Sequence, residues 1–267
     1  MEDFSATFMN VIRPIQVRDQ RRLGSQNDGG YVIPSQVINA SKLLISIGYG
    51  HNSDLEREFL CQDLKNKVEL YESSINLKLL LVSLAKSLLF FIRDDRAFPL
   101  YRIKCLLKYF QTLMMRNLFF FTLKVIPALN VASRNEISII DILNRVEDSK
   151  KTFLKIDIEG GEYACINSVL LTSQLKEMNG LVIEFHEIPK RIDSFYSILS
   201  SLRDNFFVSN IHINNFEDNV GHIPKVIEIT FINRRFVKGQ VDFVDFIPHE
   251  LDSPCNPNKP EISYIYR

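Results

Sequence analysis

Residues 154–163 read LKIDIEGGEY and join a short apolar run to a sharp turn. The apolar residues over 153–158 are typical of a buried strand, and the pair Gly160-Gly161 ends it. Asp157 interrupts the apolar run near its end, where a buried carboxylate is costly unless a cation or strong hydrogen-bond donors compensate it. The stretch therefore predicts a strand that ends at a functional carboxylate, followed by a helix over residues 163–171.

Two further carboxylates follow Asp157 in this stretch, at Glu159 and Glu162. Acidic side chains near the start of a helix are favoured by the helix dipole, so a structural capping role competes with a chemical one. We expect Asp157 to be functional and Glu162 to be structural.

Strand and helix patterns alternate on both sides of this stretch. Short apolar runs predict strands over residues 31–33, 43–47, 68–72 and 181–185. Helical patterns lie over residues 54–64, 139–143 and 195–202. Residues 206–213 and 226–232 alternate with a period of two and predict an antiparallel hairpin. Together these elements predict an α/β fold with a mostly parallel sheet and an antiparallel edge, preceded by an amphipathic lead-in over residues 1–24 and followed by an irregular tail from Pro248.

Ligands of such sheets bind beyond the carboxyl ends of the strands, so residues at strand ends are the candidate site residues. Gly48 and Gly50 follow one strand, where glycine lets a ligand approach the backbone. Glu72 ends the next strand, and its carboxylate suits hydrogen bonding to ribose hydroxyls. His186 and His212 lie at the ends of later strands, and histidine titrates near neutrality as a general base must.

The composition of the chain is that of a globular protein and argues against several classes of function. The chain has 267 residues, 46% of them hydrophobic, and its 32 Lys and Arg balance its 32 Asp and Glu. This is globular composition without the basic excess typical of nucleic-acid binding, so we expect no nucleic-acid partner. Its four cysteines are far apart and form no CxxC pair, which predicts neither a disulfide framework nor a zinc knuckle. Residues 1–15 lack a signal-peptide pattern, and we expect a cytoplasmic protein of one domain over residues 1–267.

Residues 76–134 differ from the rest of the chain. From Arg96 to Arg134 there are seven basic residues and no acidic one, and apolar residues recur at helical spacing. The apolar run over 79–92 contains Lys86 and is too short to span a membrane. We expect a helical basic insertion, either a lid whose long side chains cover apolar surface or a platform for an anionic acceptor or the inner face of a membrane. The sequence does not determine the oligomeric state.

Several of these segments resemble FkbM-type methyltransferases, which belong to the S-adenosylmethionine-dependent, Rossmann-like superfamily. The segments are DGGY (28–31), LLISIGYG (43–50), VELYES (68–73), LKIDIEGGEY (154–163), LVIEFH (181–186) and IHINN (211–215). The resemblance implies a seven-stranded sheet with its last strand inserted antiparallel, and O-methyl transfer to a hydroxyl of a sugar, a glycan or a secondary metabolite. It implies that the cofactor is bound by Asp28, Gly29, Gly48, Gly50, Glu72 and Asp157.

Methyl transfer to a hydroxyl needs alignment and a general base. We expect His186 to be that base, with His212 as the second candidate and Asp157 either orienting the base or binding the ammonium of the cofactor. A divalent metal on Asp157 and Glu184 is an alternative for activating the acceptor, but the spacing is not diagnostic and we expect no metal.

Three other functions compete with methyl transfer. A nicotinamide-dependent oxidoreductase would use the same crevice, although Ser53 stands where a dinucleotide fingerprint has Gly or Ala. A non-catalytic nucleoside-binding or interaction protein would keep the fold and lose the activity. A glycosyltransferase would carry a DxD-type motif, of which residues 157–159 are a poor version.

Overall fold

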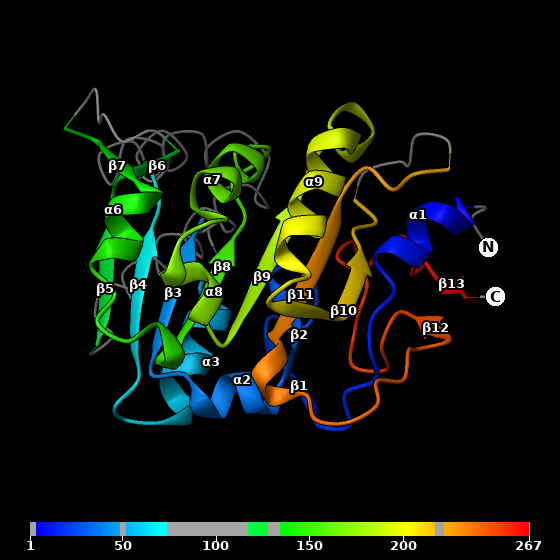
Figure 1. Cartoon of the computed structure of the whole chain (residues 1–267), viewed down its shortest axis with the longest axis horizontal. Helices are drawn as coiled ribbons and strands as arrows, with labels where there is room; N and C mark the ends of the chain where they lie inside the picture. Colours follow the sequence, from blue (N-terminus) through cyan, green and yellow to red (C-terminus); the bar gives the residue numbers. More distant parts are fainter. Residues whose placement is uncertain (1–3, 49–51, 74–116, 128–133, 217–221, 267) are drawn as a thin grey trace, which may run out of the picture.

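The computed structural model describes residues 4–48, 52–73, 117–127, 134–216 and 222–266. Its centre is a seven-stranded sheet in the order β10-β11-β9-β8-β3-β4-β5 (Figure 1). The strands are β3 (Leu43–Ile47), β4 (Lys67–Tyr71), β5 (Leu118–Phe121), β8 (Thr152–Ile156), β9 (Gly180–Phe185), β10 (Phe206–Ile213) and β11 (Ile227–Asn233). All pairings are parallel except those of β11, which runs antiparallel to both β9 and β10. The expected α/β fold, including the antiparallel last strand, is confirmed.

Helices cover one face of the sheet, and helices together with a hairpin cover the other (Figure 1). The first face carries α1 (Ala6–Val11), α6 (Ile139–Asn144), α7 (Glu162–Val169), α8 (Ser173–Glu177) and α9 (Ile192–Leu202). The second carries α2 (Ser35–Ala40), α3 (Asp54–Gln62) and the antiparallel pair of β1 (Gln20–Gly24) and β2 (Gly30–Pro34). Burial of both faces explains why the parallel strands are mostly apolar and do not alternate with polar residues.

The pleat of the strands divides their side chains between two cores. Leu154 and Ile156 of β8 pack in the core on the α7 and α9 side, whereas Phe153 packs with α2, α3 and β2. The same alternation places Ile183 of β9 in the first core and Val182 in the second.

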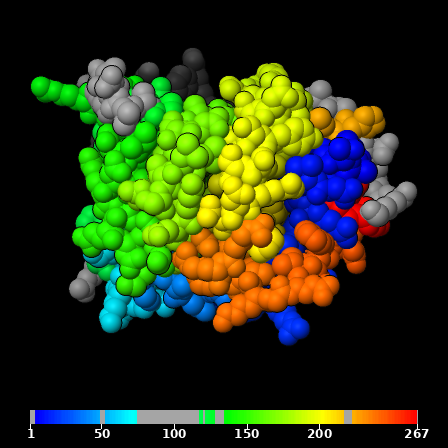
Figure 2. Space-filling view, in the orientation of Figure 1, coloured from blue at the N-terminus to red at the C-terminus, as the bar shows by residue number. Residues whose placement is uncertain are grey.

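Two terminal segments complete the molecule. The chain after β11 returns to the N-terminal segment, where the backbone N–H of Val244 donates to the carbonyl of Pro14 (3.0 Å). Figure 2 shows this returning segment in orange against the N-terminal segment in blue. The tail is irregular, as expected, except for the short pair of β12 (Phe246–Ile247) and β13 (Tyr264–Ile265).

The amphipathic lead-in over residues 1–24 and the expected helical insertion over residues 76–134 both contain strands, so the helical expectation for the insertion is corrected in part. The lead-in contains α1 but ends in the strand β1. The basic segment contributes β5, which pairs with β4, and β6 (Lys124–Ile126), which pairs with β7 (Glu136–Ser138). Apolar residues in a short run do not separate a strand from a buried helix, and here pairing with β4 decides for a strand. Residues 74–116 and 128–133 lie outside the described part of the chain.

Within the described residues, no helix has the length and hydrophobicity needed to cross a membrane.

The turn after β3 depends on a glycine. Gly48 has φ +91°, and a Cβ at this position would lie 1.6 Å from the backbone oxygen of Asp157. Gly160 has a similar φ of +98° but open space around it. We predict that Gly160→Ala lowers the free energy of unfolding by about 1 kcal/mol through backbone strain, and that Gly48→Ala lowers it clearly more because two strand ends must also separate.

Urea unfolding of both variants measures this difference. Equal losses would show that the close approach of β3 and β8 is not a constraint.

Candidate active site

The carboxyl ends of β3, β4 and β8 are held at one level by backbone hydrogen bonds. The N–H of Gly48 donates to the carbonyl of Tyr71 (3.0 Å), and the N–H of Asp157 donates to that of Ile47 (2.9 Å). The turns that follow these three strands therefore leave the sheet together, where parallel sheets bind their ligands.

A pocket of about 340 Å³ opens at this edge. Gly48, Glu72 and Asp157, three of the predicted cofactor-binding residues, all line it. Glu159 and Lys124 line it as well, so the end of the basic segment reaches the pocket. Gly50 lies outside the described residues.

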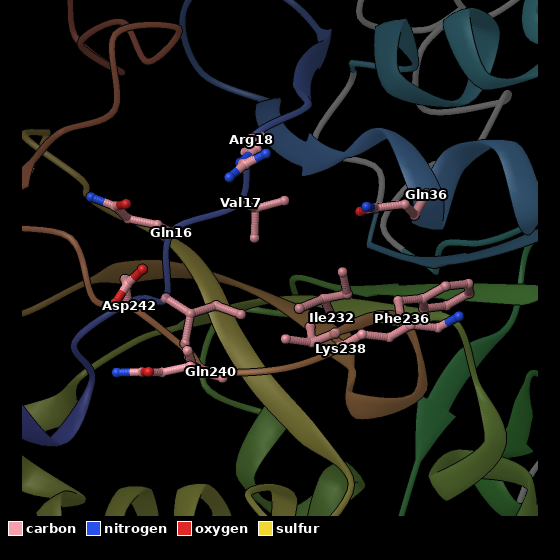
Figure 3. Close-up of a pocket in the computed structure, with 12 residues that line it drawn as sticks. Gln16, Val17, Arg18, Gln36, Ile232, Phe236, Lys238, Gln240 and Asp242 are labelled. Atoms are coloured by element: carbon pink, nitrogen blue, oxygen red, sulfur yellow. The ribbon is translucent and has the colours of Figure 1, made fainter.

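A second hollow, of about 450 Å³, lies at the other end of the strands, beside the carboxyl end of the antiparallel β11. Figure 3 shows Val17 across the hollow from Ile232 and Phe236, with Gln16 and Asp242 at one side. It adjoins the end of β11, whereas the pocket beside Asp157 lies at the carboxyl ends of the parallel strands. The pocket beside Asp157 is therefore the candidate active site.

Asp28 and Gly29, also expected to bind the cofactor, do not line this pocket. The side-chain amide of Asn52 donates to the backbone oxygen of Asp28 (3.0 Å) and fixes the turn. Burial, together with the carboxylates of Glu228 and Asp157, raises the pKa of Asp28 to about 6. The carboxylates at the strand ends of the sheet thus contribute to the raised pKa of Asp28, which lies in the turn between β1 and β2.

The buried amine of Lys155 connects the ends of β3 and β8. Its Nζ donates to the carbonyl oxygen of Gly48 (2.6 Å) and to Oδ2 of Asp157 (3.2 Å). Burial lowers the pKa of Lys155, but Asp157 and Glu56 raise it more, so the net shift is upward. A charged Lys155 therefore supplies the cation that the strand-end carboxylate needs.

Glu56 of α3 is the second buried group at this point. It is 1% exposed, and its Oε1 accepts a hydrogen bond from the hydroxyl of Ser46 (2.5 Å). Burial raises its pKa, and Lys155 opposes that shift. Sequence reasoning missed both residues. Lys155 could have been predicted as a site residue, because a lysine within an apolar strand is unusual. Glu56 could not, because it is one of several polar residues in the sequence of α3.

Glu162 holds the backbone on both sides of the site. It is fully buried, and its two carboxylate oxygens accept the N–H of Gly160 (2.8 Å) and the N–H of His186 (2.7 Å). It thereby fixes the turn after β8 to the end of β9, the structural role expected from the sequence.

His186 lies among carboxylates at the end of β9. Its Nε2 is 3.5 Å from Oε2 of Glu159, 3.7 Å from Oε1 of Glu184 and 3.9 Å from Oδ1 of Asp157. Burial lowers the pKa of His186, but the carboxylates of Glu162, Asp157 and Glu159 outweigh burial and raise it above its ordinary value. His186 does not itself line the pocket, but its Nε2 lies within 3.9 Å of Asp157 and Glu159, which do.

Glu184 is buried beside His186. The amide of Asn214 donates to its Oε1 (3.0 Å). Burial raises the pKa of Glu184 well above its ordinary value, and Asp157 and Glu228 raise it further. Glu184 therefore favours the protonated form or a nearby cation.

His212, expected as the second candidate base, does not reach the pocket. It is 2% exposed, with Nδ1 2.9 Å from Oε2 of Glu228 and Nε2 3.2 Å from the carboxylate of Glu261. Both ring nitrogens are engaged, so the expectation of a second base is corrected. The tail residue Glu261 is distant in sequence, and only the folded chain brings it to His212.

A family model matches residues 130–209, a stretch that contains β7, β8 and β9 and ends in β10, and the match indicates a methyltransferase that uses S-adenosylmethionine. The matched model is the Methyltransferase FkbM domain, which confirms the resemblance over this segment. The matched segment contains Asp157, Glu184 and His186, so the family model covers these three residues of the candidate site. Neither a nicotinamide-dependent oxidoreductase nor a non-catalytic protein is supported.

Solved structures with partial similarity are also methyltransferases. A predicted O-methyltransferase from Agrobacterium tumefaciens has 13% identity and a TM-score of 0.32, over 74% of this chain and 79% of that one. A precorrin-6y C5,15-methyltransferase from Geobacter metallireducens has 12% identity and a TM-score of 0.34, over 73% of this chain and 85% of that one. These values are low, and the fold assignment depends on the strand order instead. No curated protein matches the sequence.

The buried charge of Lys155 gives a stability prediction. Lys155→Met leaves Asp157 and Glu56 without their cation, and we expect the free energy of unfolding at pH 7 to fall by about 3–5 kcal/mol. The loss should be smaller at pH 5. The raised pKa of Glu56 lets that group take up a proton in the folded state as the pH falls, and a neutral acid needs no counter-charge.

Urea unfolding at both pH values tests this, with Lys150→Met, an exposed lysine, as the control. A loss of stability that does not depend on pH would contradict the compensation of Glu56 by Lys155.

Proposed function

We propose that this enzyme transfers a methyl group from S-adenosylmethionine to a hydroxyl of a sugar or glycan, or of a related secondary metabolite, with His186 as general base. The observation that carries the proposal is the position of His186, whose Nε2 faces carboxylates that line the pocket at the carboxyl ends of β3, β4 and β8.

The residues of the pocket fit the cofactor. S-adenosylmethionine carries a ribose diol and two cationic groups, the sulfonium and the ammonium. Glu72 stands at the end of β4, where a carboxylate can accept both ribose hydroxyls. Asp157 and Glu159 line the same pocket and provide negative charge for the ammonium. Gly48 lets the backbone at the end of β3 lie close to the backbone of Asp157.

Bound S-adenosylmethionine supplies an activated methyl group, which an acceptor oxygen takes in line as the carbon–sulfur bond breaks. The chain must then remove the hydroxyl proton of the acceptor. Neutral His186 can accept that proton at Nε2, and the nearby carboxylates stabilise the imidazolium that forms. Glu162 holds the backbone of His186, so the ring is positioned before the acceptor arrives.

The basic segment suggests the charge of the acceptor. Lys124 lines the pocket and belongs to the stretch from Arg96 to Arg134 that has no acidic residue. A glycan attached to a phosphate-containing carrier, or at a membrane surface, would match that charge. This part of the proposal concerns the acceptor only, and the cofactor site does not depend on it.

The cofactor assignment predicts a binding result. Calorimetric titration with S-adenosylhomocysteine should show binding, and Glu72→Ala should weaken it by about 10- to 100-fold, because two hydrogen bonds to a charged acceptor are lost. Glu147→Ala, which removes an exposed carboxylate elsewhere, should bind as the wild type does. Binding of the reduced nicotinamide cofactor in place of S-adenosylhomocysteine would contradict the assignment.

The base assignment predicts a pH profile. The base must be neutral to accept a proton, and the pKa of His186 is raised, so kcat should increase with pH through a limb above about 6.5. Glu159→Gln removes a carboxylate that raises this pKa, so the limb should move to lower pH. His186→Gln should lose about 10²–10⁴-fold in kcat and keep its affinity for S-adenosylhomocysteine.

Turnover with a panel of sugars and glycans measures these effects. Unchanged turnover in His186→Gln would exclude His186 as the base and leave the cofactor assignment intact.

A further inference from the structure

Three side chains with metal-binding atoms meet away from the pocket, at the edge of the sheet formed by β10 and β11. His212 comes from β10, Glu228 from β11 and Cys255 from the C-terminal tail. Each is at least 96% buried, and one ligand atom from each lies within 4.8 Å of the other two. Imidazole, thiolate and carboxylate are the three ligand types that zinc takes in proteins.

The distances between these groups are close to those of a metal site. The Sγ of Cys255 is 3.7 Å from Nδ1 of His212 and 3.7 Å from Oε1 of Glu228. Tetrahedral zinc with Zn–S of about 2.3 Å and Zn–N or Zn–O of about 2.0–2.1 Å places its ligand atoms roughly 3.4–3.6 Å apart. Nδ1 of His212 lies 2.9 Å from Oε2 of Glu228, so these two groups need to separate by only a few tenths of an ångström.

A carboxylate stands where the outer partner of a metal-binding histidine is found. Oε1 and Oε2 of Glu261 both lie 3.2 Å from Nε2 of His212. Metal-bound histidines usually donate their other ring N–H to such a carboxylate, which fixes the tautomer. A proton on Nε2 leaves the lone pair of Nδ1 directed at Glu228 and Cys255.

The surroundings are rich in buried negative charge. Glu228 lies directly opposite both Glu184 and His212 in the sheet. The side chain of Asp252 is buried nearby, with the amide of Asn210 as a donor (3.1 Å) and the guanidinium of Arg22 at 3.6 Å. Buried carboxylates at this density need cations.

We propose that His212, Glu228 and Cys255 bind a zinc ion, with Glu261 as the outer carboxylate of His212. The ion fastens the C-terminal tail to β10 and β11, because Cys255 and Glu261 both belong to the tail. The site is independent of methyl transfer, and its three protein ligands leave the fourth tetrahedral position of the zinc to a water molecule. It was not expected from the sequence, since its residues are far apart and lack the close spacing of zinc motifs.

The test uses the full chain, freed of metal with a chelator and titrated with Co²⁺ as a spectroscopic substitute for zinc. We expect a cobalt–thiolate charge-transfer band that saturates at one equivalent and disappears when Zn²⁺ is added. Cys255→Ser should abolish the band, whereas Cys61→Ser, which changes an exposed cysteine, should leave it unchanged. Zinc should raise the melting temperature of the wild type and have less effect on Cys255→Ser.

Glu261→Gln serves as a second variant in case Cys255→Ser does not fold. It keeps all three ligands, so the band should remain while Co²⁺ affinity falls about 10- to 100-fold. Absence of a thiolate band in the wild type, or a band that persists in Cys255→Ser, would overturn the proposal. His212 would then be an imidazolium shared between Glu228 and Glu261.

Discussion

The amine of Lys155 is the point on which the site depends. It is buried, donates to the carbonyl of Gly48 and to the carboxylate of Asp157, and interacts with Glu56 on α3. The charge of Lys155 thus connects β3 to β8 and compensates the carboxylate of Asp157, which lines the pocket. It also stabilises the buried carboxylate of Glu56 on α3. Without it, the catalytic edge of the sheet would hold uncompensated negative charge, which a protein interior does not tolerate.

The register of the sheet explains why so many polar groups meet here. Glu228 of β11 lies opposite Glu184 of β9 and His212 of β10, so these side chains share one face. The other face of the same strands is apolar and packs against α7 and α9. At the level of Leu44, Phe153 and Ile232 the same face is apolar, so the polar side chains are confined to the part of the sheet nearer the carboxyl ends of the parallel strands. The apolar core therefore lies between the sheet and α7 and α9 and around the amino ends of the parallel strands, whereas the polar residues of the site lie at the carboxyl ends.

The two halves of the polar row have different environments. His186 stands behind a pocket wall, with partners 3.5 Å or more from its Nε2, so a proton can be exchanged there. His212 is enclosed by the tail and closely engaged at both nitrogens. Both histidines end strands of similar appearance in the sequence, and the difference arises because the tail residues Cys255 and Glu261 fold over only one of them.

The sequence by itself determined the alternation of strands and helices, the antiparallel hairpin, and the strand-end positions of Gly48, Glu72, Asp157 and His186, because periodicity and turn residues are local signals. It misassigned β5 and β6, since a strand of three or four residues is defined by its partner and not by its own pattern. Only the tertiary structure decided which carboxylates face each histidine. Burial and pKa depend on groups distant in the chain, and no local pattern records which of them meet.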